Sequence, residues 1–162
     1  MEFQDKIKKY REKGRTIVFT DESGFVESAP RTHGYSIKGE RCYGIHDWHR
    51  SKRTNVIGAL MEKSLLTVSI FNCNINGAVF NSWVEQDLIP KLPANSVVVM
   101  DNAAFHKNED LKTIIEKSGH TIEYLPPYSP DLNPIEPKWF QAKSRRRKYN
   151  CDIDTLFEKY MT

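Results

Sequence analysis

Short apolar runs and amphipathic stretches alternate along the chain of 162 residues. A continuous apolar run at residues 96–100 (SVVVM) predicts a strand that is covered on both faces. Runs rich in β-branched and aromatic residues predict four further strands, at residues 16–21, 53–61, 65–72 and 121–125. Only a short polar turn separates the second of these four from the third, so we expect the two to pair antiparallel.

Apolar side chains at helical spacing predict three helices. Residues 76–92 form an amphipathic helix that a proline interrupts in its last turn. Residues 109–118 form a second helix, with Gly119 at the position of a C-cap. A last helix is expected from about Ile135 into the run QAKSRRRK, after a stiff Pro-rich loop.

The order of these elements predicts a single α/β domain with a mixed sheet. Residues 26–53, which are polar and punctuated by glycine, are expected to form an irregular excursion or a hairpin. Hydrophobic residues make up 39% of the chain and charged residues 28%, as in ordinary globular proteins. This composition excludes a disordered chain and an integral membrane protein.

Targeting and redox features favour the cytoplasm. No apolar run approaches the roughly 18 residues that a membrane span needs. The charged N-terminus lacks the apolar core of a secretory signal. Cys42, Cys73 and Cys151 are widely spaced and include no C-x-x-C pair, which gives little support to a disulfide framework or a cysteine zinc site. We therefore expect a cytoplasmic protein in a reducing compartment.

Three carboxylates stand where elements begin or end. Asp21 closes the first predicted strand, Asp101 closes the buried strand, and Glu136 begins the last helix. Because sites form beyond the carboxyl ends of strands in open α/β sheets, the two aspartates can converge there if their strands are adjacent, and Glu136 is the third candidate. An all-oxygen site of this kind suits Mg²⁺ or Mn²⁺, and a pair of such ions about 4 Å apart can catalyse phosphoryl transfer.

Each carboxylate also has a purely structural interpretation. An aspartate at a strand end is commonly a turn former, and this applies to both Asp21 and Asp101. Glu136 could close a capping box with Asn133, although Pro137 disturbs that register. The positions of the carboxylates alone leave the two interpretations open.

Four sequence blocks resemble the catalytic domain of DDE transposases of the mariner superfamily, particularly its bacterial insertion-sequence branch. The blocks are TDESGF (20–25), RTNVIGAL (53–60), VVVMDNAAFHK (97–107) and YLPPYSPDLNPIEPKWFQAK (124–143), in the order that the family has them. The last block, with 34 residues between Asp101 and Glu136, is highly specific. The resemblance implies an RNase H-like α/β fold. In this fold a mixed five-stranded sheet is flanked by helices, and its first three strands are antiparallel.

The resemblance also implies a reaction and its residues. Asp21, Asp101 and Glu136 would be the metal-binding catalytic triad, with two Mg²⁺ or Mn²⁺ ions as cofactor. The enzyme would hydrolyse a phosphodiester at the transposon end, and the freed 3′-hydroxyl would then attack target DNA, typically at a TA dinucleotide. A homodimer on DNA is expected, because two ends must be joined. In a bacterial cell the protein would associate with the nucleoid when bound to DNA.

Several residues have both a supporting and a structural interpretation. His106 lies in the DN-x-x-x-H pattern and could support the site or be a structural histidine, and Asn102 could orient Asp101 or a metal-bound water or form a turn. His46 and His49 lack a second ligand group at suitable spacing, so a loop is favoured over a metal cluster. The tryptophans are expected to anchor the core or loops rather than stack on bases: Trp48, Trp83 and Trp139.

The net charge of +3 hides an uneven distribution. Residues 138–148 carry six basic side chains and no acidic one, whereas residues 16–137 carry 11 basic and 15 acidic ones. Basic residues just after Glu136 could hold DNA phosphates beside the metals, or could form a solvated helix face. These candidate DNA-binding residues are Lys143, Arg145, Arg146, Arg147 and Lys148.

The expected domain organisation is a basic lead-in at residues 1–15, the DDE catalytic domain at 16–150 and a helical tail at 151–162. The first strand begins too early for the helix-turn-helix region that full-length family members carry. A separate helix-turn-helix polypeptide is therefore a possible partner. Two alternative functions are a non-catalytic regulator of a full-length transposase and an RNase H-like nuclease.

Overall fold

The computed structural model describes residues 2–26, 53–103 and 106–161. Five strands form one sheet in the order β3-β2-β1-β4-β5. The pairs β1–β2 and β2–β3 are antiparallel, and the pairs β1–β4 and β4–β5 are parallel, which confirms the expected mixed sheet. The strands are β1 (Ile17–Val26), β2 (Arg53–Met61), β3 (Ser64–Phe71), β4 (Val97–Met100) and β5 (Thr121–Tyr124).

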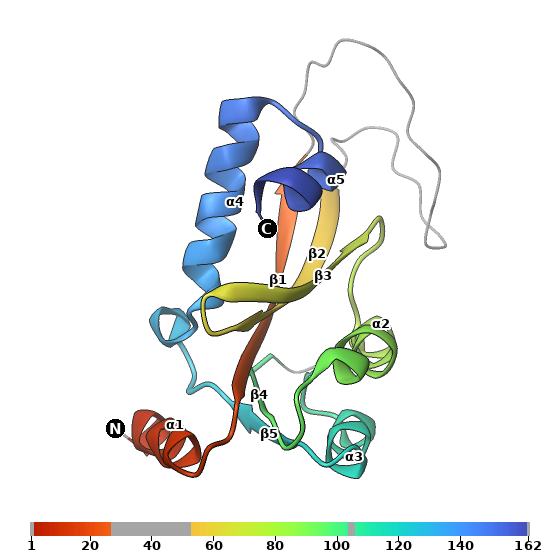
Figure 1. Ribbon diagram of the computed structural model, residues 1–162. Coiled ribbons are helices and arrows are strands. Elements are labelled where there is room, and N and C mark those ends of the chain that lie inside the picture. The colour runs from red at the N-terminus through yellow and green to blue at the C-terminus, as the bar shows by residue number, and fades with distance from the viewer. Residues whose placement is uncertain (1, 27–52, 104–105, 162) are drawn as a thin grey trace.

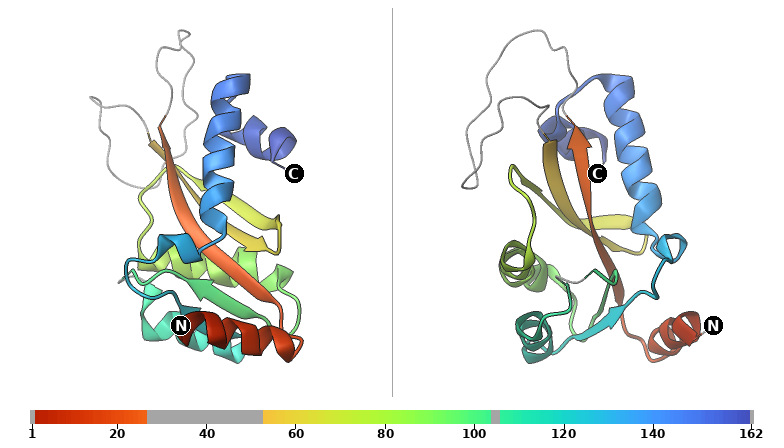
Figure 2. Two further views of the ribbon diagram at one scale, coloured as in Figure 1. Left: turned by 90° about the vertical axis from the view of Figure 1, so that its left-hand side faces the viewer. Right: turned by 180° about the vertical axis from the view of Figure 1, so that it is seen from behind.

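Helices cover both faces of this sheet (Figures 1 and 2). On one face lie α2 and α3, and on the other lie α1, α4 and α5. The helices are α1 (Glu2–Glu12), α2 (Gly77–Trp83), α3 (Glu109–Lys117), α4 (Ile135–Tyr149) and α5 (Ile153–Thr155). None of the helices in the described residues is both long and apolar enough to cross a membrane.

The helical segment after β3 agrees with its sequence. Asn76 caps α2 by accepting a hydrogen bond from the Val79 backbone at 2.9 Å. Beyond α2 the chain stays helical through Lys91, first as a wide turn at Val84–Leu88 and then as a tight turn that contains Pro90. The proline therefore changes the helix in its last turn, as expected.

The next elements also follow their sequence signals. All four residues of β4 are fully buried, in agreement with a strand covered on both faces. Asn108 caps α3 by accepting from the Leu111 backbone at 2.7 Å. Gly119 follows the helix with a φ of +87°, which glycine adopts without a steric cost.

The end of the first strand differs from the prediction. We expected this strand to stop at a turn after Asp21, but β1 runs on to Val26. The residues DESG are small or polar, yet β2 pairs with this part of β1 along its whole length, from Asp21 opposite Gly58 to Val26 opposite Arg53. Pairing with β2 therefore outweighs the turn-forming tendency of these residues. Apart from its two end residues, the expected excursion at 26–53 lies outside the described residues.

The N-terminal segment and one cysteine also differ from the sequence interpretation. Residues 2–12, expected only as a basic lead-in, form the helix α1. Its apolar residues are few, but Ile7 is buried against Ile17 and Phe19 of β1. Cys73 is disulfide-bonded, although the spacing of the cysteines gave little support to a disulfide framework, whereas Cys151 is free.

Candidate metal centre

The parallel pairing of β1 with β4 brings the first two carboxylates together. Ile17, Val18 and Phe19 pair with the residues eighty positions later, from Val97 to Val99. If the same pairing is extended by two residues beyond Phe19 and Val99, Asp21 lies level with Asp101, which directly follows β4. Because side chains alternate across a strand, both aspartates lie on the face that α4 covers.

The third carboxylate reaches the same face through α4. Gly58 of β2 pairs with Asp21, and Trp139 packs on this glycine. A methyl group added at Gly58 would lie only 2.7 Å from Cη2 of Trp139, so the close approach of α4 to the sheet requires glycine. Trp139 is one helical turn after Glu136. Its packing on Gly58 therefore holds Glu136 near Asp21.

Asp21 and Glu136 interact directly. Burial, and then a side-chain hydrogen bond with Glu136, raise the pKa of Asp21 from 3.8 to about 9. The negative charges of Glu22 and Glu136 act in the same direction. Without a cation Asp21 therefore holds a proton at neutral pH and is hydrogen-bonded to Glu136. Glu136 uses its side chain here, so the alternative in which it serves only to close a capping box is not supported.

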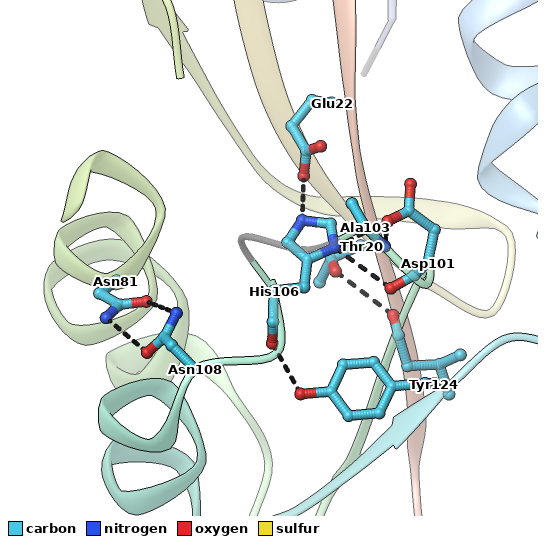
Figure 3. A network of polar contacts seen from close by, with 9 residues as sticks. Thr20, Glu22, Asn81, Asp101, Ala103, His106, Asn108 and Tyr124 are labelled. Atoms are coloured by element: carbon cyan, nitrogen blue, oxygen red, sulfur yellow. Dashed lines mark hydrogen bonds and ion pairs between the residues drawn. The ribbon is translucent and has the colours of Figure 1, made fainter. Parts of the chain in front are cut away.

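A histidine between two carboxylates forms the other half of the site (Figure 3). Nδ1 of His106 lies 2.7 Å from Oδ1 of Asp101, and Nε2 lies 2.9 Å from Oε2 of Glu22. The side chain of His106 is fully buried. Its backbone carbonyl accepts a hydrogen bond from the Tyr124 hydroxyl at 2.6 Å, and its ring packs on Phe80 at 4.5 Å between centroids.

The two neighbouring carboxylates keep this histidine charged. Burial by itself lowers the pKa of His106, but hydrogen bonds with Asp101 and Glu22 outweigh it and raise the pKa to about 10. In turn, burial opposes ionisation of Asp101, while the hydrogen bond and charge of His106 hold the pKa of Asp101 below its usual value. Asp101 is thus an ionised carboxylate, in contrast to Asp21.

The donor set fits a divalent metal ion. Oxygen atoms of Asp21, Glu22 and Asp101 lie within 4.8 Å of one another. The oxygens of Asp21 and Asp101, together with those of Glu136, form a hard, all-oxygen set of the kind that Mg²⁺ and Mn²⁺ bind. Nearby, Oδ1 of Asn102 is buried and has no hydrogen-bond partner among the described residues. The crowded carboxyl pair and this unsatisfied oxygen both fit a site built for a cation and its bound water.

The basic residues of α4 divide into two groups. Arg145 bonds the Tyr160 carbonyl through Nη1, and Nη1 of Arg146 donates to the Val26 carbonyl at 2.8 Å. Arg147 and Lys148 are exposed. Lys143 lies over the ring of Phe25 at 5.2 Å. The structure therefore gives the first two arginines a role in holding chain segments together that the sequence did not suggest.

An open hollow of about 460 Å³ adjoins this part of α4. Its basic lining comes from Lys143, Arg146 and Arg147, and the end of β1 forms the other side. Three positively charged side chains therefore face an anionic ligand that enters this hollow.

Among the tryptophans, Trp83 and Trp139 are core residues, as expected. The tryptophan and histidines of the segment His46–His49 lie outside the described residues. Glu22 is the site residue that sequence reasoning missed. The signal that could have found it is its place directly after Asp21, but an acidic residue in a strand gives no sign that its side chain reaches a distant histidine.

The sequence matches the DDE superfamily endonuclease family over residues 16–156. A comparison with curated proteins finds no match. One similar solved structure is a Mos1 transposase paired-end complex with the left transposon end, with a TM-score of 0.66, 17% identity, and coverage of 88% of this chain and 46% of that chain. A second is the catalytic domain of Mos1 mariner transposase, with a TM-score of 0.60, 15% identity, and coverage of 88% and 66%.

A third similar structure is the mariner Mos1 paired-end complex with Mg, with a TM-score of 0.59, 18% identity, and coverage of 86% and 45%. At these identities the likeness concerns the fold, and it confirms the expected RNase H-like architecture. The chain spans about half the length of the transposase chains in the two paired-end complexes.

Proposed function

The chain belongs to the DDE superfamily endonuclease family, and from this premise we propose that it is the catalytic domain of a DNA transposase. The observation that carries the proposal is the convergence of Asp21, Asp101 and Glu136 from three separate segments on one face of the sheet. A purely structural role would not require a buried, protonated aspartate beside a second carboxyl group.

In this proposal Asp21, Asp101 and Glu136 are the catalytic triad and hold divalent metal ions. Bound Mg²⁺ or Mn²⁺ would activate the attacking hydroxyl and stabilise the leaving oxygen at phosphorus, most effectively as a pair of ions. Asp101 is preorganised for this role, because it is ionised and fixed by His106. Asp21 would give up its proton and hold the cation as a carboxylate if a metal ion were bound.

Two neighbours would support the triad. His106 holds Oδ1 of Asp101, and its positive charge reduces repulsion among the acidic groups. The unsatisfied Oδ1 of Asn102 would accept a hydrogen bond from a water bound to the metal. Both roles concern the position of the ligands rather than the chemistry at phosphorus.

DNA is the proposed substrate, both as transposon ends and as a target of the TA type. A similar solved structure is a Mos1 transposase complex with a transposon end. In this chain, Lys143, Arg147 and Lys148 lie on α4 beyond Glu136, where they would contact backbone phosphates. Arg145 and Arg146 would contribute to DNA binding mainly by keeping this helix in place.

The assembly on DNA is a further part of the proposal. Joining two transposon ends favours a homodimer, and a separate helix-turn-helix polypeptide would supply recognition of the terminal repeats. The catalytic domain would comprise residues 16–150, between a basic lead-in at 1–15 and a helical tail at 151–162. Membership of the bacterial insertion-sequence branch, with action at the nucleoid, rests on the sequence blocks alone.

Metal-dependent DNA cleavage tests the proposed function. The full chain is incubated with supercoiled plasmid and with end-labelled duplex DNA, with Mg²⁺, with Mn²⁺ or with a chelator. We expect nicks that leave 3′-hydroxyl ends, only with metal, and background cleavage from Asp21→Asn, Asp101→Asn and Glu136→Gln. The matched control is Asp131→Asn, an exposed aspartate shortly before α4.

Three results would contradict the proposal. Cleavage by Asp101→Asn at the wild-type rate would mean that another site, or another protein, cuts the DNA. Cleavage of RNA–DNA hybrids but not of duplex DNA would identify an RNase H-like nuclease instead. A folded wild-type chain that cleaves none of these substrates, but inhibits a full-length transposase, would identify a regulator.

A further inference from the structure

Glu22 takes part in the site without lying on the same face of the sheet as the triad. It follows Asp21 along β1, so its side chain projects to the opposite face, which α2 and α3 cover. There Oε2 of Glu22 lies 2.9 Å from Nε2 of His106. The carboxylate is about one-sixth exposed, because 17% of the side-chain surface remains accessible.

His106 is held in one orientation from several directions. Its ring nitrogens contact Glu22 on one side and Asp101 on the other, at 2.9 and 2.7 Å. The ring packs on Phe80 of α2, and the backbone carbonyl is bonded to Tyr124 of β5. A ring fixed in this way cannot follow Asp101 if that carboxylate rotates.

The contacts of Asp101 are concentrated on one oxygen. Oδ1 accepts from the Ala103 backbone at 3.0 Å and lies 2.7 Å from Nδ1 of His106. In Figure 3 the other oxygen is directed away from this network. The side chain of Asp101 is 41% exposed, so its free oxygen is accessible to a cation.

We propose that Glu22 is a positioning residue which, through His106, fixes the Asp101 carboxylate so that its free oxygen faces the metal. The chain of contacts runs from Glu22 to His106 to Oδ1 of Asp101 and links both faces of the sheet. The inference rests on the proposed function, because it assigns Asp101 as a metal ligand. It places Glu22 outside the ligand set, although its carboxylate lies near Asp21 and Asp101.

A glutamate that acts through a hydrogen bond and one that binds metal respond differently to substitution. In Glu22→Gln the amide oxygen still accepts a hydrogen bond from Nε2 of His106, but the negative charge is lost. A positioning role therefore survives this change to a large extent. A ligand role does not, because a neutral amide binds Mn²⁺ much more weakly than a carboxylate.

The experiment measures the affinity of the full chain for Mn²⁺ alone, by isothermal titration and by the loss of the free Mn²⁺ electron spin resonance signal. We expect Glu22→Ala to weaken Mn²⁺ binding by about 10–100-fold, the usual effect of losing an outer partner of a metal ligand. We expect Glu22→Gln to stay within about threefold of wild type, and Glu85→Ala, which removes an exposed glutamate, to be unchanged.

Circular dichroism and thermal unfolding without metal establish that each variant is folded. If Glu22→Ala does not fold, Glu22→Asp takes its place, since the shorter side chain withdraws from His106 with the same expected loss. Unchanged Mn²⁺ affinity in a folded Glu22→Ala or Glu22→Asp would overturn the inference, as would a loss in Glu22→Gln as large as that in Glu22→Ala. The experiment reads out metal binding and not DNA cleavage. A wild type that binds Mn²⁺ but cleaves no DNA would therefore contradict the proposed function without contradicting this inference.

Discussion

At the scale of single residues, the site combines carboxyl groups in opposite states. Asp101 is kept ionised by His106, while Asp21 is buried against Glu136 and holds a proton. A metal-free protein is destabilised by such a pair, because desolvation and repulsion both oppose the charged form. Groups that serve function commonly lower the free energy of unfolding in this way.

Replacing Asp21 should therefore stabilise the metal-free protein. Asp21→Asn removes the ionisable group, and we expect a gain of about 0.5–2 kcal/mol in the free energy of unfolding. The pKa of Asp21 is raised from 3.8 to about 9 on folding, so the folded state binds more protons and wild-type stability falls as the pH rises through this range. The gain should accordingly be larger at pH 8 than at pH 5.

Chemical unfolding in the presence of a chelator, at both pH values, measures this difference. Saturating Mg²⁺ should then stabilise the wild type but have little effect on Asp21→Asn. A variant that is less stable than the wild type at pH 8, with the chelator present, would show that the Asp21–Glu136 pair supports the fold rather than the metal.

At the scale of elements, the position of α4 depends on one close contact. Trp139 packs on Gly58, which is the residue of β2 that pairs with Asp21. The same contact that buries the tryptophan also sets the distance from Glu136 to Asp21. Stability and site geometry are therefore coupled at this point of the fold.

Gly58→Ala should damage both stability and activity. The added methyl group would lie 2.7 Å from Trp139, and relief of this overlap should cost about 1–3 kcal/mol and displace α4. Adding Trp139→Phe, which provides a smaller ring, should recover part of both losses. Thermal unfolding and Mn²⁺ affinity of the two single variants and the double variant measure the coupling. Strictly additive effects would contradict direct packing of α4 on Gly58.

Sequence patterns predicted the elements well where burial decides the structure. The continuous apolar run of β4 and the amphipathic spacing of α3 leave few alternatives. The end of β1 could not be predicted, because DESGF carries turn-forming residues and only pairing with β2 keeps it extended. Helix α1 was missed since a single residue, Ile7, is buried in a charged segment.

The site was predictable only in part. Asp21, Asp101 and Glu136 stand at recognisable places in the sequence, and the DN-x-x-x-H pattern indicated His106. The contact of Glu22 with His106 joins residues 84 positions apart and depends on the sheet register, which no local pattern encodes. Likewise, the run of basic residues in α4 gave no sign that Arg145 and Arg146 bond backbone carbonyls.

At the scale of the whole molecule, charge is separated along α4. The carboxylates gather near its N-terminal end, and exposed basic residues occupy its last turns. A DNA strand whose phosphate reaches the metals would therefore continue over basic side chains. Electrostatic attraction of this kind gives affinity that depends on salt and not on sequence.

Arg147→Ala combined with Lys148→Ala should weaken DNA binding and its salt dependence. Each lost phosphate contact lowers the slope of log affinity against log salt by about 0.9, so the double variant should lose about 1.8. Fluorescence anisotropy with a labelled duplex at several salt concentrations measures this slope. Lys112→Ala with Lys117→Ala removes the same charge from α3, on the other face of the sheet, and should leave the slope unchanged. An equal decrease of the salt slope in both double variants would rule out a specific basic surface on α4.

The location of bound metal tests the central claim most directly. Crystals of the full chain grown with MnCl₂ would reveal Mn²⁺ by its anomalous scattering. We predict anomalous density in contact with the carboxylates of Asp21, Asp101 and Glu136, and its loss in crystals of Asp101→Asn. Density elsewhere on the molecule, or density that is the same in Asp101→Asn, would contradict the assignment of these three carboxylates as the metal centre.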